Sequence, residues 1–156
     1  MKNDRLLWVD DEIDLLRPHI LFLESKGYEV HTVSNGQDAL DRCRETDYDL
    51  IFLDIYMDGI TGMETAKRIR RADHGCRIIF ITISPEFAVE SYNVNASFYL
   101  LKPIGKDGVF SALDRCGLQA AEQSRSVEVA TACGRTQLLV HEVSYTEYVR
   151  RQVLVH

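Results

Sequence analysis

Short apolar runs alternate with longer segments of helical spacing along most of this chain, and this alternation constrains its fold most strongly. Most of the runs are rich in Leu, Ile, Val and aromatic residues. They lie at residues 6–9, 28–33, 49–53, 77–82 and 97–101. After the first run, Ile13, Leu16, Ile20 and Leu23 follow at intervals of three and four residues, which is the spacing of one helix face. Strands that are apolar on both faces predict a parallel sheet covered by helices on both sides.

The number of strand and helix repeats predicts a flavodoxin-like three-layer α/β/α fold. Right-handed crossovers and about 118 residues suit a five-stranded parallel sheet of order 2-1-3-4-5, which binds ligands at the carboxyl ends of its strands. Thr61 can cap the helix before the fourth strand, and a helix carrying Phe87, Val89 and Tyr92 is expected before the fifth. Pro18 lies inside the first helical pattern, so it should kink this helix unless the helix begins late.

Composition excludes several classes of protein. The 156 residues have a net charge of -6, with 24 acidic against 18 basic side chains, which is not the charge of a nucleic-acid-binding protein. No apolar run is long enough to span a membrane, and the N-terminus lacks the pattern of a signal peptide. The four cysteines form no C-x-x-C pair, which favours reduced thiols over disulfides or zinc ligands. We therefore expect a cytoplasmic protein without a membrane segment.

The C-terminal part of the chain has a different pattern. Val127 to Ala130 alternates apolar and polar residues, 133–135 looks like a turn, and 137–141 reads as a second strand, so this part is predicted to be β-rich. Its three arginines and three glutamates balance, so the acidic excess lies entirely in the preceding residues. The expected organisation is a domain at 1–120, a linker at 121–126 and a β segment at 127–156.

Polar residues stand where four of the predicted strands end. Asp10 and Asp11 follow the first strand, Asp54 ends the third, Thr82 ends the fourth and Lys102 follows the fifth. Because the carboxyl ends of parallel strands lie at one edge of a sheet, these side chains should converge where this topology binds ligands. Each residue alone has an ordinary explanation, such as a helix cap, a turn or a solvated position. Their shared position at one edge favours a functional site.

The chemistry of this group of residues is that of phosphoryl transfer. Three clustered carboxylates repel one another unless a cation lies among them, and a small set of oxygen ligands favours Mg²⁺. Asp54 can then attack a phosphoryl group to form an acyl phosphate, while Lys102 and the metal neutralise charge on the phosphoryl oxygens. Thr82 can donate a hydrogen bond to one of these oxygens.

Five short motifs occur in a fixed order along the chain. They are Val9-Asp10-Asp11-Glu12, Leu53-Asp54-Ile55-Tyr56-Met57, Gly62-Met63, Thr82, and Tyr99-Leu100-Leu101-Lys102-Pro103. Together they resemble the bacterial response-regulator receiver domain, over residues 4–120. The resemblance implies that a partner sensor histidine kinase phosphorylates Asp54. It also implies that Mg²⁺ is held by Asp11, Asp54 and the main-chain carbonyl of Tyr56, with Asp10 assisting.

Thr82 and Tyr99 match the switch pair of that family. In such a pair the hydroxyl moves toward the phosphoryl group and the aromatic ring turns inward, so that a change in charge is read out as a change in packing. Core packing explains Tyr99 equally well from the sequence alone. The resemblance implies no enzyme acting on outside substrates, but only Mg²⁺-dependent self-phosphorylation and self-dephosphorylation.

Residues 77–104 are similar to receivers attached to LytTR-type DNA-binding domains. In the C-terminal part, Val127-Glu128-Val129, Gly134-Arg135 and Val143-Ser144-Tyr145-Thr146-Glu147 are similar to the opening strands of a LytTR domain. The rest of such a domain, with its DNA-reading loops, is expected to be absent from this chain. The resemblance thus implies control of transcription through a complete C-terminal domain, whereas this chain alone should not bind DNA specifically. Its strand edges and uncovered apolar face predict that the tail pairs with its counterpart in a second molecule or folds against the receiver, giving a homodimer.

Two residues depart from the receiver pattern, and two other functions remain open. Asp58 stands where proline is common and adds a carboxylate near the site, and Ile83 stands where a small residue is usual and should restrict access to Asp54. These departures suit a phosphorylation-independent interaction scaffold. A Mg²⁺-dependent phosphohydrolase with an aspartyl nucleophile is a further alternative, but it needs an acid two residues after the nucleophile, where this chain has Tyr56.

Other polar residues are predicted to be structural. Arg68, Arg70 and Arg71, near the end of a predicted helix, are expected to be solvated and to interact favourably with the helix dipole. The five histidines, His19 and His31 among them, show no metal-binding spacing and are expected at the surface or in packing. Neither group enters the predicted site.

Overall fold

The structure of the chain is a computed structural model. It describes residues 3–73 and 75–118 in full and, beyond them, the strands at 126–131, 134–139, 146–149 and 152–155. The chain divides into two compact units, Met1–Leu118 and Gln119–His156.

The first unit alternates strands and helices around one sheet. Its elements are β1 (Arg5–Val9), the 3-10 helix η1 (Ile13–Leu16), α1 (Arg17–Ser25), β2 (Glu29–Val33), α2 (Gly36–Glu45), β3 (Leu50–Asp54), α3 (Gly62–Ala72), β4 (Arg77–Thr82), α4 (Ala88–Ser91), the 3-10 helix η2 (Tyr92–Val94), β5 (Phe98–Leu101) and α5 (Lys106–Arg115). All four strand pairings are parallel, and the strand order is β2-β1-β3-β4-β5. The predicted flavodoxin-like three-layer fold is confirmed.

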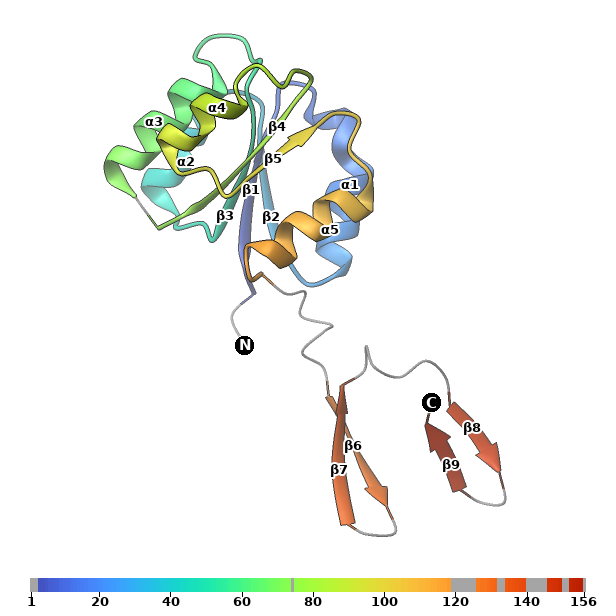
Figure 1. Cartoon of the computed structure of the whole chain (residues 1–156). Coiled ribbons are helices and arrows are strands. Elements are labelled where there is room, and N and C mark those ends of the chain that lie inside the picture. The colour runs from blue at the N-terminus through green and yellow to red at the C-terminus, as the bar shows by residue number, and fades with distance from the viewer. Residues whose placement is uncertain are drawn as a thin grey trace. The chain divides into compact units, whose positions relative to one another are not determined.

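Helices cover both faces of the sheet, with α1 and α5 on one face and α2, α3 and α4 on the other (Figure 1). Every residue of β3 is buried, because this strand lies at the centre of the sheet. Trp8 and Phe52, from neighbouring strands, are fully buried with ring centroids 4.5 Å apart. Burying such a side chain stabilises the fold by about 1.5–3 kcal/mol. The sheet is therefore a rigid platform for residues at its strand ends.

Local sequence determines where the helices begin. Pro18 lies in the first turn of α1, so this helix begins late and needs no kink. The Thr61 hydroxyl accepts a hydrogen bond from the Glu64 N–H at 3.2 Å and caps α3, as predicted. Within the residues described, no helix is both long enough and apolar enough to cross a bilayer.

The segment before β5 differs from the predicted helix. α4 has only four residues and passes into η2, which ends at Asn95. Asn95 has a left-handed backbone with φ of 49°, a conformation that asparagine tolerates and that stops a helix. Val89 and Tyr92 are each 80% exposed, so the spacing that predicted a buried helix face was misleading here.

Arg70 was wrongly predicted to be solvated. Its side chain is buried, with 8% exposed, although Arg68 and Arg71 are exposed as expected. The Arg70 guanidinium donates hydrogen bonds from Nε to the Val94 carbonyl at 2.7 Å, from Nη1 to the Asp73 carbonyl at 3.2 Å and from Nη2 to the Asn95 carbonyl at 3.3 Å. Arg70 therefore ties the end of α3 to the turn that leads into β5.

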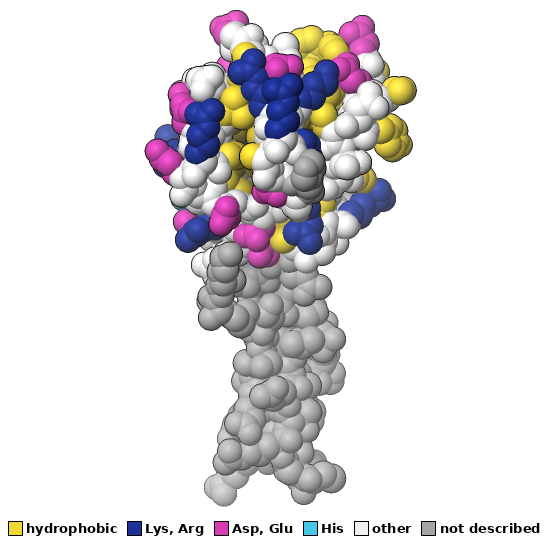
Figure 2. All heavy atoms as spheres, turned by 90° about the vertical axis from the view of Figure 1, so that its left-hand side faces the viewer, with side chains coloured by type: hydrophobic (Ala, Val, Ile, Leu, Met, Phe, Trp, Pro, Cys, Tyr) yellow, Lys and Arg dark blue, Asp and Glu magenta, His cyan; other side chains and the backbone are white. Residues whose placement is uncertain are grey.

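The face that carries α3 has mixed charge. Figure 2 shows basic side chains lying beside acidic ones on this face. Two of the ion pairs there are Lys67 with Glu90 and Arg68 with Glu64, each at 2.9 Å. Because neighbouring charges cancel, this face does not present the single-sign basic surface that binding to a nucleic-acid backbone requires.

The second unit contains two antiparallel hairpins, which confirms that this segment is β-rich. They are formed by β6 (Ser126–Thr131) with β7 (Gly134–Leu139) and by β8 (Thr146–Val149) with β9 (Gln152–Val155). Gly134 and Arg135 pair with β6, so these two residues of the predicted turn belong to a strand. The residue that opens this predicted turn and the end of the strand predicted at 137–141 lie outside the described residues.

Candidate functional site

The predicted site residues meet at the carboxyl edge of the sheet. Asp10 directly follows β1, Asp54 is the last residue of β3, Thr82 is the last residue of β4 and Lys102 directly follows β5. These strands occupy adjacent positions in the sheet, and the register pairs Asp54 with Ile81 on β4. The strand order thus brings together residues that lie up to 92 positions apart in the sequence.

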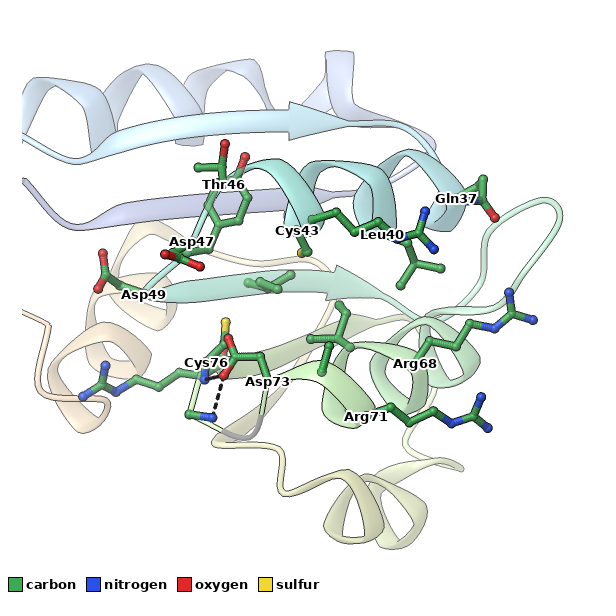
Figure 3. Close-up of a pocket in the computed structure, with 17 residues that line it drawn as sticks. Gln37, Leu40, Cys43, Thr46, Asp47, Asp49, Arg68, Arg71, Asp73 and Cys76 are labelled. Carbon is green, nitrogen blue, oxygen red and sulfur yellow. Dashed lines mark hydrogen bonds between the residues drawn. The ribbon is translucent and has the colours of Figure 1, made fainter.

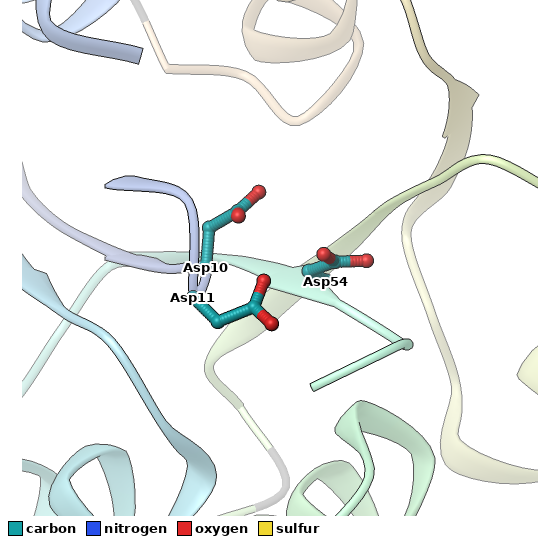
Figure 4. A group of neighbouring side chains, drawn as sticks. All are labelled: Asp10, Asp11 and Asp54. Carbon is teal, nitrogen blue, oxygen red and sulfur yellow. The ribbon is translucent and has the colours of Figure 1, made fainter. Parts of the chain in front are cut away.

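Asp10, Asp11 and Asp54 form a cluster of carboxylates (Figure 4). One oxygen from each lies within 4.8 Å of the others. Asp10 is fully buried and Asp54 is 4% exposed, whereas Asp11 is exposed. Two buried carboxylates beside a third are unfavourable unless cations compensate them. A group of hard oxygen ligands with one exposed member fits Mg²⁺, which keeps part of its water shell.

Lys102 supplies one compensating cation. Its Nζ lies 2.8 Å from Oδ2 of Asp10 and 3.1 Å from Oδ2 of Asp54. Burial alone would lower the pKa of Lys102, but hydrogen bonds to both carboxylates outweigh burial and raise it. The ammonium group therefore stays charged at neutral pH.

The carboxyl group of Asp54 is desolvated and held by two hydrogen-bond donors. Burial raises the pKa of Asp54 above its usual value, and the hydrogen bond from Lys102 opposes this change without cancelling it. The Tyr56 N–H donates to Asp54 Oδ1 at 3.2 Å and the Lys102 ammonium donates to Oδ2. These two donors fix the orientation of a carboxylate that has lost part of its hydration shell.

Thr82 and Tyr99 lie on the neighbouring strands β4 and β5. Thr82 is fully buried, and its Oγ1 has no hydrogen-bond partner among the residues described. A buried hydroxyl without a partner is costly, so its presence at a strand end beside Asp54 points to a missing oxygen acceptor. The Tyr99 hydroxyl donates to the Ser84 carbonyl at 2.6 Å, and its half-buried ring contacts Phe80.

Gly62 belongs to this site, although the sequence pattern assigned it no role. A Cβ at position 62 would lie 2.0 Å from the Asp54 carbonyl oxygen and 2.8 Å from Cα of Ile55. The Gly62 N–H donates to the Ile55 carbonyl at 3.0 Å. Only glycine lets the first turn of α3 approach the backbone of Asp54 this closely. The glycine directly after the predicted N-cap was the available signal.

The two departures from the family pattern lie outside the carboxylate cluster. Asp58 is exposed and is not a member of the carboxylate cluster. Ile83 is 71% exposed and lines a hollow of about 400 Å³ together with Asp10 and Lys102. The apolar side chain of Ile83 therefore lies beside the opening of the site and does not occupy the site itself.

A larger hollow of about 750 Å³ lies between α2 and α3, away from the carboxylate cluster (Figure 3). Its floor contains the thiols of Cys43 and Cys76. Burial raises the pKa of Cys43 to about 11 and that of Cys76 to about 12, so both thiols are protonated at neutral pH and are poor nucleophiles. The larger of these two hollows is therefore not the one that contains residues of the candidate site.

Comparison with known proteins defines the family. Residues 6–114 match the response regulator receiver domain. This match covers more than half of the chain, so the chain belongs to the response-regulator receiver family, as predicted. The family works in two-component signal transduction, which favours this function over the scaffold and phosphohydrolase alternatives.

Individual relatives agree with this assignment. The chain is 31% identical over 114 residues to the sensory transduction protein LytT of Bacillus subtilis, which covers 71% of this chain and 46% of that protein. It is 30% identical over 125 residues to the transcriptional regulatory protein LytR of Staphylococcus aureus strain MW2, which covers 78% of this chain and 50% of that protein. The chain thus spans about half the length of the curated relatives it matches.

Solved structures show the same fold. The response regulator TrrA of Thermotoga maritima, in complex with Mg²⁺ and BeF, is 32% identical with a TM-score of 0.66, and the match covers 72% of this chain and 98% of that one. The chemotaxis protein CheY4 of Vibrio cholerae is 30% identical with a TM-score of 0.69, and the match covers 74% of this chain and 99% of that one. Both matches span nearly the whole of the solved chain.

Proposed function

We propose that this protein accepts a phosphoryl group on Asp54 from a partner sensor histidine kinase, in a reaction that depends on Mg²⁺. The observation that carries the proposal is the environment of Asp54. Its carboxyl group is buried and held by Lys102 at 3.1 Å, and the unpaired Thr82 hydroxyl is buried at the end of the neighbouring strand. This arrangement supplies a nucleophile, a cation and a hydrogen-bond donor for one phosphoryl group.

The proposed transfer forms one bond to phosphorus and breaks another. An Asp54 carboxylate oxygen bonds to phosphorus while the bond between phosphorus and the kinase histidine nitrogen breaks, and the histidine leaves as neutral imidazole after taking up a proton. Lys102 neutralises charge on the transferred group, and the Thr82 hydroxyl donates to one of its oxygens. In the reverse modification, water attacks the phosphorus of the acyl phosphate, the bond between phosphorus and the Asp54 oxygen breaks, and inorganic phosphate leaves. We propose no chemistry for this protein beyond gaining and losing its own phosphoryl group.

Mg²⁺ would be held by Asp11, Asp54 and the main-chain carbonyl of Tyr56, with Asp10 assisting. The cluster of three carboxylates supports this assignment, and so does the Mg²⁺ named for the TrrA structure. When bound, the ion supplies positive charge next to the phosphoryl oxygens. In this structure Asp10 lies 2.8 Å from the Lys102 ammonium group, and this ion pair directs the ammonium group at the site.

Thr82 and Tyr99 would transmit the change. A phosphoryl oxygen is the acceptor that the Thr82 hydroxyl lacks, so phosphorylation draws β4 and the loop after it toward Asp54. The Tyr99 hydroxyl contacts that same loop at the Ser84 carbonyl. Movement of the loop must break or shift this hydrogen bond, which couples the Tyr99 ring to the modification.

The output would be control of transcription. We propose a receiver domain at 1–120, a linker at 121–126 and a partial LytTR-like β segment at 127–156, in a cytoplasmic protein without a membrane partner. The full response would need a complete C-terminal DNA-binding domain. The kinship with LytT and LytR supports this output, and the two hairpins of the second unit are compatible with a homodimer.

Acetyl phosphate with Mg²⁺ tests the proposed function directly. The intact chain should gain the mass of one phosphoryl group, and Asp54→Asn should gain none while remaining folded. Asp58→Asn is the matched control, because it makes the same change at an exposed carboxylate four positions away. Mapping of the phosphoryl group to Asp10, Asp11 or a hydroxyl side chain would refute the assignment.

A further inference from the structure

His19 contacts the loop that follows the site lysine. His19 lies on α1, and its Nε2 is 2.8 Å from the carbonyl oxygen of Ile104, which is 85 residues away in the sequence. Ile104 belongs to the connection between β5 and α5, two residues after Lys102. α1 and α5 cover the same face of the sheet, which makes this contact possible (Figure 1).

The hydrogen-bond partner determines the tautomer of His19. A carbonyl oxygen can only accept, so Nε2 must carry the proton and donate it. Nδ1 is buried without a partner in the described part of the chain. The indole N–H of Trp8 is a buried donor that also lacks a partner, and the two ring centroids are 6.2 Å apart. The described contact that orients the ring by a hydrogen bond is therefore the one to Ile104.

The loop itself has few backbone constraints. The Lys102 N–H donates to the Thr82 carbonyl at 2.8 Å, which ties the lysine to β4. Pro103 has no N–H and cannot extend this strand pairing. The next carbonyl held from outside the loop is that of Ile104, and α5 begins only at Lys106. The backbone around Lys102 is therefore fixed by β4 on one side and by His19 on the other.

We propose that His19 is a positioning residue for Lys102, through its hydrogen bond to the Ile104 carbonyl. The inference rests on the proposed function, in which the Lys102 ammonium neutralises the phosphoryl oxygens. His19, Ile104, Asp10 and Lys102 line one hollow of about 400 Å³. When the Ile104 carbonyl loses its hydrogen bond to His19, the loop can move into this hollow. The Lys102 ammonium group then spends less time between the two carboxylates.

Two substitutions separate this role from simple packing. His19→Gln keeps a donor near the position of Nε2, whereas His19→Leu keeps an apolar body and removes the donor. In the full chain, His19→Leu should lower the maximal rate of phosphorylation by acetyl phosphate about fivefold, the effect of one lost hydrogen bond. The concentration of acetyl phosphate at half-maximal rate should change less, and His19→Gln should retain a rate close to that of the original chain.

His31→Leu is the matched control. His31 also makes a short hydrogen bond, between Nδ1 and the Tyr48 hydroxyl at 2.7 Å, and its Nε2 lies 3.2 Å from Oε1 of Glu29. Both contacts involve β2, at the opposite edge of the sheet from Lys102. The control should lose a similar amount of thermal stability and leave the phosphorylation rate unchanged. Equal rates in His19→Leu and His19→Gln, or an equal loss of rate in His31→Leu, would overturn the positioning role.

A second measurement does not depend on phosphorylation. The NMR signals of the Lys102 ε-methylene group should move toward those of an exposed lysine in His19→Leu and stay in place in His19→Gln. If these signals follow the prediction while no chain is phosphorylated on Asp54, the proposed function fails and the positioning role stands. If the signals are the same in all three chains, the positioning role fails regardless of the phosphorylation result.

Discussion

Replacing Arg70 with methionine is expected to destabilise the receiver unit strongly. Methionine retains much of the aliphatic volume of arginine but has no donor groups. The change removes three hydrogen bonds to main-chain carbonyls, at 2.7, 3.2 and 3.3 Å. The acceptors at Val94 and Asn95 lie in the turn that ends η2, so this turn loses its tie to α3.

The distances set the size of the effect. The bond from Nε at 2.7 Å is short and charge-assisted, and such a bond contributes about 1.5–3 kcal/mol. The two longer bonds add roughly 0.5 kcal/mol each. The Arg70 guanidinium also loses hydration when the chain folds, and this cost offsets part of the stabilisation from the three bonds. We expect the free energy of unfolding to fall by about 2 kcal/mol. With a urea dependence of about 1.5 kcal/mol per molar, the midpoint should fall by about 1.3 M.

Urea unfolding followed by the fluorescence of Trp8 measures this change. Trp8 is the only tryptophan in the chain and is fully buried in the sheet, so its signal reports the receiver unit alone. Arg71→Met is the control, since the same substitution at the exposed neighbour should change stability by less than about 0.5 kcal/mol. Arg70→Lys should recover less than half of the loss, because one ammonium cannot reach three carbonyls as the planar guanidinium does. Equal midpoints for the two methionine variants would refute the reasoning.

Three further changes test the site and the second unit. Asp11→Ala should weaken Mg²⁺ binding by about tenfold or more, measured by titration of Trp8 fluorescence, and an unchanged affinity would remove this residue from the ligand set. Ile83→Ala should shorten the half-life of the phosphorylated form, because the apolar side chain shields the site from water; identical hydrolysis rates in both chains would contradict the steric argument. A chain ending at His156 should sediment as a dimer to a greater extent than one ending at Arg125, and it should not retain DNA sequence-specifically; equal monomer fractions would exclude pairing through the tails.

The location of the candidate site could be predicted because the carboxyl ends of parallel strands all lie at one edge of the sheet. Asp10, Asp54, Thr82 and Lys102 each stand at the end of a predicted strand, and the strand order follows from right-handed crossovers. No knowledge of side-chain packing was needed to bring them together. The unpaired state of the Thr82 hydroxyl, in contrast, depends on the packing of every neighbour and has no signature in the sequence.

Arg70 shows where pattern reasoning failed although a signal was present. Met63, Ala66 and Arg70 follow at intervals of three and four, so Arg70 lies on the buried face of α3, yet its place in a run of arginines suggested a solvated helix end. Two of the three carbonyls that accept from Arg70 come from a turn 24 and 25 residues later. The contact of His19 with Ile104 spans 85 residues and leaves no local pattern at all. Such long-range polar contacts were visible only in the folded chain.

The buried Thr82 hydroxyl without a partner and the desolvated Asp54 carboxyl group also have a consequence for the lifetime of the protein. Both groups make the unmodified fold less stable than it would be if they were satisfied. Anything that supplies partners to the folded form alone stabilises that form by mass action. Because cellular proteases act on the unfolded fraction, we expect the unphosphorylated chain to be degraded faster than the phosphorylated one. Under the proposed function, a cell without the signal would then hold less of this protein.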